Sequence, residues 1–158
     1  MRVVPSLRIP LLSLWSGWAL FVVSFFLTAF RGKDSSMTGH ACAWVAVTAW
    51  APVSLATLVR NPVDADAWMK FSLGWFNVTN LLGFLAPCLA IFPGTRRFSG
   101  IVALGCAAGA VQGFALVSGA LGGEPFWKEM APGFVVWCAG YLCIAWAAWA
   151  MGRRPPLR

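Results

Sequence analysis

The sequence predicts an all-α fold, a polytopic bundle of five transmembrane helices, and two observations support this prediction. First, 59% of the 158 residues are hydrophobic and only 11% are charged, a composition that suits lipid better than water. Second, five uncharged runs each have about the 20 residues that a helix needs to cross a bilayer. Open strands would leave backbone groups unpaired in hydrocarbon, so we expect each run to be a helix. The runs are residues 11–30, 41–59, 71–92, 98–121 and 134–151.

The first two runs need separate justification. Arg2 and Arg8 precede the first run as they would in a secretion signal, but its apolar stretch is too long for one. No small-x-small cleavage site follows Phe30, so we expect a retained membrane anchor. Pro52 lies near the middle of the second run, which makes that run the weakest of the five. If it does not cross, the bundle has four spans plus a re-entrant or interfacial second segment.

Polar residues of the first run fall along one helix face. Ser13, Gly17, Ser24 and Thr28 share this face, and Leu20 lies in the middle of it. We interpret the face as core, and we expect Leu20 to limit how closely another helix can approach.

Short linkers join the runs. The linker "RNPVDADAW" offers Asp64 or Asp66 as the cap of the third helix, and "PGTRR" predicts a tight reversal between the third and fourth runs. Glu124 and Pro125 stand in the order expected where a helix begins before the fifth run. No linker is long enough to fold separately, so residues 1–158 are expected to form a single integral membrane domain.

The basic residues of the linkers predict the orientation. With five spans they divide five against seven between the two sides, and the richer side is taken as cytoplasmic. The N-terminus is then outside and the C-terminus cytoplasmic, whereas four spans put both termini in the cytoplasm. The net charge of +7 suits anionic lipid headgroups and needs no nucleic acid. The seven basic residues of the richer side are Arg31, Lys33, Arg96, Arg97, Arg153, Arg154 and Arg158.

The fourth run carries a ridge of small residues. Gly105, Gly109 and Gly113 recur every four residues and share one helix face with Gln112. Such a ridge lets two helix backbones approach closely, which matters in lipid, where the hydrophobic effect does not drive helices together. We therefore predict that this face packs against another helix, in the same chain or in another copy.

Three amides within the apolar runs form the candidate site. The "PGTRR" reversal makes the third and fourth runs an antiparallel hairpin, and matching depths about its centre places Gln112 opposite Asn77 and Asn80. We expect Gln112 to hydrogen-bond one of these asparagines, an interaction worth about 0.6 to 2 kcal/mol in a membrane. The favoured interpretation is that these amides only stabilise the packing of the two helices. The alternative is a site for a small polar ligand or lipid headgroup.

No pattern of catalytic or metal-ligating residues accompanies these amides. His40 is the only histidine, and the five runs contain no carboxylate, lysine or arginine, which argues against ion coupling. The cysteines form no Cys-x-x-Cys pair and are interpreted as buried, inert thiols. We expect no catalytic residue, no metal site and no cofactor. The cysteines are Cys42, Cys88, Cys106, Cys138 and Cys143.

Two segments, "SFFLTAF" and "LGWFNVTNLLGF", resemble an uncharacterised group of small bacterial multi-pass inner-membrane proteins. That group tends to end its first span in a Ser-apolar-Pro pattern, where this chain has Thr28. The resemblance implies a bacterial inner membrane.

Three functions follow as hypotheses from the sequence. The leading one is a non-enzymatic accessory or structural subunit that acts through helix packing, in a larger membrane complex or as a homo-oligomer. The runner-up is a small-solute or lipid-handling membrane protein in which Asn77, Asn80 and Gln112 line a cavity. A membrane enzyme built on His40 and the loop acids is third.

Overall fold

The computed structural model describes residues 5–32, 36–50, 65–119 and 127–153. These residues are mostly helical, and their five longest helices have 12 to 21 residues. Those helices are α1 (Pro5–Ser24), α2 (Gly39–Trp50), α4 (Ala65–Leu85), α6 (Ser99–Val117) and α7 (Pro132–Gly152). The shorter elements are β1 (Thr28–Arg31), β2 (Ser36–Thr38), α5 (Cys88–Ile91), η1 (Pro93–Phe98) and η2 (Trp127–Glu129).

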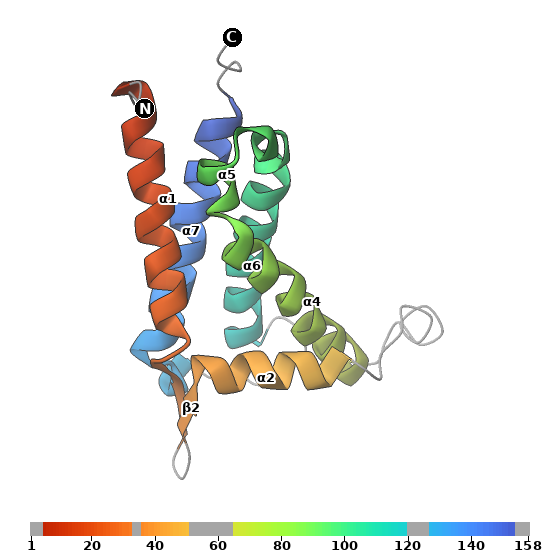
Figure 1. The fold of residues 1–158 in the computed structure, drawn as a ribbon. Helices are drawn as coiled ribbons and strands as arrows, with labels where there is room; N and C mark the ends of the chain where they lie inside the picture. Colours follow the sequence, from red (N-terminus) through yellow and green to blue (C-terminus); the bar gives the residue numbers. More distant parts are fainter. Residues whose placement is uncertain (1–4, 33–35, 51–64, 120–126, 154–158) are drawn as a thin grey trace.

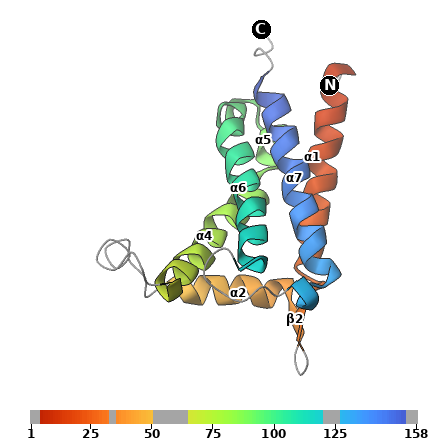
Figure 2. The same cartoon turned by 180° about the vertical axis from the view of Figure 1, so that it is seen from behind.

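The helices form a bundle with one helix lying across its end. Helix α7 packs against α1 and α6, and α6 also packs against α4. Figures 1 and 2 show α1, α6 and α7 running along the bundle, with α4 leaning away from them. Helix α2 lies crosswise beside the β1–β2 hairpin at one end, here called the α2 end. The start of α1, the end of α7 and α5 lie at the other end, here called the terminal end.

Three helical segments of the described chain are long and apolar enough to cross a membrane. They are Gly74–Ile91, Pro93–Val117 and Pro132–Gly152. The apolar part described for α1 is shorter, Arg8–Ser24. The whole of α1 has 20 residues, which corresponds to about 30 Å of helix, the thickness of a hydrocarbon core.

Helix α2 does not have the form expected of the second apolar run. It has 12 residues, or about 18 Å of helix, and it lies across the other helices rather than along them (Figure 1). Residues 51–59 of that run lie outside the described residues.

The first apolar run is helical only in part, which corrects the expectation of a helix over residues 11–30. Helix α1 ends at Ser24, whose Oγ donates to the carbonyl of Phe21. The carbonyls of Phe25 and Leu27 then accept hydrogen bonds from the backbone N–H groups of His40 and Gly39. Strands β1 and β2 follow as an antiparallel hairpin. The end of the run thus pairs its backbone groups with β2 and α2 instead of within a helix.

The third apolar run is interrupted near its end. Helix α4 ends at Leu85, and Pro87 precedes the short α5. A proline has no backbone N–H and its ring clashes with the preceding turn, so it breaks a continuous helix. The chain then reverses through η1, where the hydroxyl of Thr95 lies 2.7 Å from the carbonyls of both Cys88 and Phe92 and can donate to either. This reversal is the one predicted for "PGTRR".

The fourth apolar run, residues 98–121, forms a helix that ends at Val117. Gly119 has a φ of 75°, the left-handed conformation that glycine adopts without a Cβ clash. Its backbone N–H donates to the carbonyl of Leu116, which satisfies one of the last carbonyls of the helix.

Helix α1 packs on the central helix α7 along a regular seam. The buried residues of α1 alternate at spacings of four and three, as in a left-handed helix pair. Ser13 Oγ donates to the carbonyl of Cys143 across the seam, 3.3 Å away. Leu20 is 38% exposed and lies outside the seam, so it does not limit the approach as we had expected. The buried residues are Pro10, Leu14, Gly17, Phe21 and Ser24.

Candidate functional site

Tyr141 is the centre of a buried hydrogen-bonded cluster between α4 and α7. Its side chain is fully buried, and its Oη lies 2.8 Å from Asn80 Oδ1 and 3.1 Å from Thr79 Oγ1. A hydroxyl has one hydrogen to donate, so it can form one full hydrogen bond as a donor. The contact to Asn80 is the shorter of the two and is taken as that bond. Thr79 Oγ1 is also 3.1 Å from the carbonyl of Phe76. A phenol placed among apolar helices thus has its hydrogen-bonding capacity used within the chain.

Trp137 completes the cluster from the same face of α7. It precedes Tyr141 by four residues, which is about one helical turn, and its Nε1 donates to Asn80 Oδ1 at 3.3 Å. A carbonyl oxygen has two lone pairs and can accept both donors. The rings of Trp137 and Tyr141 also meet edge to face, with centroids 4.4 Å apart. Asn80 is therefore the acceptor that joins α4 to α7.

The three amides singled out in the sequence do not all meet at one point. The hydrogen bonds described for Asn80 go to Trp137 and Tyr141, not to Gln112. Asn77 and Gln112 are half-buried on α4 and α6 and take part in further interactions. The partner on which the cluster depends is thus α7, which follows α5 and α6 in the chain.

The three glycines of α6 lie against side chains of the same chain. A Cβ added at Gly109 would lie 2.8 Å from Tyr141 Cε2 and 3.1 Å from Thr79 Cβ. At Gly113 the nearest atom would be Trp137 Cζ3, at 2.8 Å, and at Gly105 it would be Leu82 Cδ1. The ridge therefore faces both α4 and α7, and the side chains of the cluster pack against it.

Sequence reasoning missed Thr79, Trp137 and Tyr141. Tyr141 is the only tyrosine of the chain and lies in an uncharged run. A hydroxyl in such a run needs a partner because an unpaired polar group in hydrocarbon is costly. That signal could have identified Tyr141, but not its partner, since α4 and α7 are about 60 residues apart in the chain.

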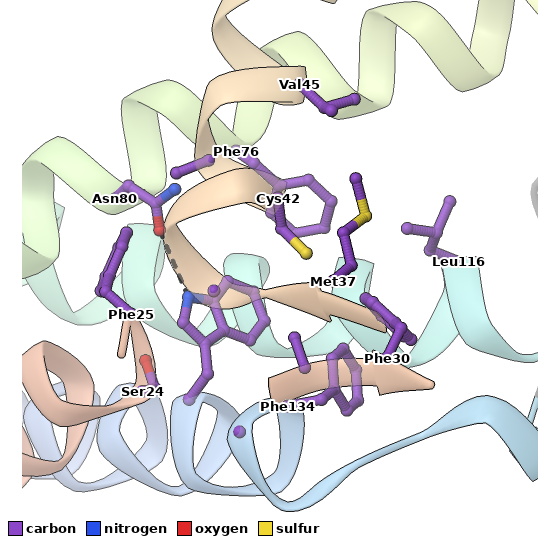
Figure 3. Close-up of a pocket in the computed structure, with 15 residues that line it drawn as sticks. Ser24, Phe25, Phe30, Met37, Cys42, Val45, Phe76, Asn80, Leu116 and Phe134 are labelled. Carbon is purple, nitrogen blue, oxygen red and sulfur yellow. Dashed lines mark hydrogen bonds between the residues drawn. The ribbon is translucent and has the colours of Figure 1, made fainter. Parts of the chain in front are cut away.

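A cavity of about 160 Å³ lies between this cluster and α2 (Figure 3). Its walls come from the end of α1, the hairpin, α2, α4, α6 and α7. In Figure 3, Cys42 and Met37 lie between Phe76 on one side and Phe134 on the other. The lining residues are Ser24, Phe25, Ala29, Phe30, Met37, Gly39, Cys42, Ala43, Val45, Phe76, Asn80, Leu116, Gly133, Phe134 and Trp137.

The wall of this cavity is apolar. The hydroxyl of Ser24 in this wall donates to the carbonyl of Phe21. The side-chain carbonyl of Asn80 accepts from Trp137 and Tyr141. Burial raises the pKa of Cys42 to about 11, although a backbone hydrogen bond lowers it in part. The thiol is therefore neutral at physiological pH. The cavity suits a hydrocarbon group better than a polar solute.

Within the described residues no group of three or more His, Cys, Asp or Glu side chains could hold a metal ion. Comparison of the chain with protein-family models, curated proteins and solved structures finds no match.

Proposed function

We propose that this chain is a four-span integral membrane protein that binds an alkyl chain of a membrane lipid in the cavity beneath α2. The single observation that carries the proposal is the apolar, partly open cavity bordered by the spans, the hairpin and α2. This is the lipid-handling hypothesis of the sequence, except that the cavity is lined mainly by apolar side chains and not by the three amides. Of the three amides, Asn80 lines the cavity, and its carbonyl oxygen is held by α7.

The size and position of the cavity support a hydrocarbon occupant. An engineered cavity of about 150 Å³ lined by apolar side chains stays dry and binds benzene, so a space of about 160 Å³ admits a short stretch of alkyl chain. The cavity lies near the end of α6 and the start of α7, since Leu116 and Gly133 line it. An alkyl chain entering from the bilayer would reach it close to the level of the headgroups.

The 12-residue length of α2 and its crosswise position support four spans rather than five (Figure 1). With four spans, the sequence places seven basic and no acidic residues on the side of the terminal end, and five of each on the side of the α2 end. The positive-inside rule then assigns the terminal end to the cytoplasm. We propose that α2 lies in the membrane interface on the opposite side, in a bacterial inner membrane as the sequence resemblance implies.

The glycine contacts bear on the leading hypothesis of the sequence, an accessory subunit that acts through helix packing. Gly105, Gly109 and Gly113 are covered by α4 and α7 of the same chain. The ridge therefore supports the fold of this chain and is not free to hold another subunit. An accessory role needs a different surface, and the lipid cavity is the function that the geometry favours.

Photo-crosslinking tests the proposed function. The purified chain is placed in nanodiscs that contain phosphatidylcholine with a diazirine on one acyl chain, and adducts are mapped by mass spectrometry. We expect adducts on Met37 and Cys42, which lie inside the cavity. Ala43→Phe adds a ring to the cavity wall and should reduce these adducts about tenfold, because the ring takes the space of the alkyl chain.

Ala19→Phe is the matched control, since Ala19 is exposed on α1 and does not line the cavity. It should leave the cavity adducts unchanged. Adducts on lipid-facing residues such as Leu104, which is 74% exposed, are expected in all three proteins. The same adduct density at Leu104 and Cys42, unaffected by Ala43→Phe, would overturn the proposal.

A further inference from the structure

Three arginines gather at the terminal end, away from the cavity. Arg96 and Arg97 lie in η1, which contacts α7, and Arg153 follows the last residue of α7. Gly152 lies against Ser99 Oγ, so Arg153 is beside the turn that carries the other two. We call Arg96, Arg97 and Arg153 the arginine cluster.

No carboxylate pairs with the arginine cluster among the described residues. Arg97 lies over the ring of Phe98, 4.7 Å from its centroid, and Arg153 lies over Trp149 at 3.9 Å. Both guanidinium groups are thereby held at the surface with their N–H donors still available. Arg96 is half-buried, and its Nε is buried without a hydrogen-bond partner. A buried donor without an acceptor is rare, and Arg96 brings to this end a third guanidinium group without a carboxylate partner in the described part of the chain.

Helix α6 adds to the positive potential at this position. It begins at Ser99, directly after η1, and has 19 residues. The positive end of the helix dipole lies here and favours an anion, while the N–H of Ser99 already donates to the carbonyl of Arg96. The arginine cluster and this helix end face the same level of the molecule.

We infer that the arginine cluster binds the phosphodiester of an anionic phospholipid in the leaflet at the terminal end. A phosphodiester supplies the oxygen acceptors that the guanidinium groups lack, and Phe98 and Trp149 provide apolar surface beside it for the glycerol and upper acyl carbons. The positive-inside rule explains a surplus of basic residues at this end. It does not explain why two of these guanidinium groups are held over aromatic rings beside a third.

This inference rests on the proposed membrane topology and is independent of the cavity. The cavity is at the α2 end and is lined by none of the three arginines. A variant that fills the cavity, Ala43→Phe, should therefore keep the preference for an anionic lipid.

Native mass spectrometry of the detergent-purified chain tests the inference, with phosphatidylglycerol or phosphatidylcholine added. We expect the wild type to prefer phosphatidylglycerol, and the triple variant Arg96→Gln, Arg97→Gln, Arg153→Gln to bind it about 10- to 100-fold more weakly. Arg31→Gln is the matched control, because Arg31 is exposed on β1 at the α2 end. It should keep the affinity of the wild type.

Two results would overturn the inference. One is equal affinity of the wild type for the two lipids. The other is protection of the chain against heat by inorganic phosphate alone as strongly as by phosphatidylglycerol, which would assign the cluster to a soluble anion. If the triple variant does not fold, the test uses two other measurements of phosphatidylglycerol binding: the affinity of Arg96→Gln alone, and the affinity of the wild type at increasing salt. A preference for phosphatidylglycerol that is insensitive to both would contradict the inference.

Discussion

Gly140→Leu is expected to prevent α1 from packing on α7. A Cβ at this position would lie 2.8 Å from the backbone nitrogen of Phe21 and 2.9 Å from the backbone oxygen of Gly17. Backbone atoms cannot turn aside as a flexible side chain can, so α1 must move away. Leu14 and Phe21, both fully buried, would then lose their packing against α7. We expect a loss of about 3 kcal/mol or more in the free energy of unfolding, measured by thermal unfolding in detergent.

Gly100→Leu is the matched control for this variant. Gly100 is exposed on α6, and a Cβ there would meet no atom within 4 Å. Replacing a helical glycine that touches nothing should change the stability by about 1 kcal/mol at most, in the stabilising direction. Equal losses at positions 100 and 140 would show that the α1–α7 contact is not the close approach described here.

Asn80→Leu is expected to destabilise the chain by about 1 to 3 kcal/mol, because it leaves the indole N–H of Trp137 buried without its acceptor. The hydroxyl of Tyr141 keeps Thr79 as a neighbour. In a double-mutant cycle with Tyr141→Phe, the two changes should couple by about 0.5 kcal/mol or more, since the side chains share a hydrogen bond.

Gln112→Leu supplies the comparison for this cycle. No hydrogen bond joins Gln112 to Asn80 among the bonds described for Asn80. We therefore expect a smaller coupling for the pair Asn80 and Gln112 than for the pair Asn80 and Tyr141. The reverse order would mean that Asn80 belongs to the α4–α6 contact, as the sequence had suggested.

The apolar runs predicted where helices form, because the hydropathy of each segment can be calculated from its residues alone. Helix ends depend on local contacts instead. Ser24 ends α1 because the following carbonyls are paired with Gly39 and His40, and Pro87 breaks the third run. The first of these needs knowledge of the hairpin, whereas the second could have been anticipated from the proline.

The candidate site was predicted in part. Asn80 was identified because an amide in an apolar run needs a partner. Matching depths across the "PGTRR" reversal considered only the neighbour of α4 in sequence, so α7 and its Tyr141 were not found. Helix α2 shows a second limit of sequence patterns. Its residues are as apolar as those of a span, and only the arrangement of the other helices places it crosswise (Figure 1).

The sidedness of the N-terminus tests the central claim, that the chain crosses the membrane four times with α2 across one end. Green fluorescent protein, which fluoresces in the cytoplasm, and alkaline phosphatase, which is active outside it, are each fused before Met1 and, separately, after Arg158. The account predicts fluorescence and no phosphatase activity at both ends of the chain. Phosphatase activity at the N-terminus together with fluorescence at the C-terminus would establish an odd number of spans and contradict the account.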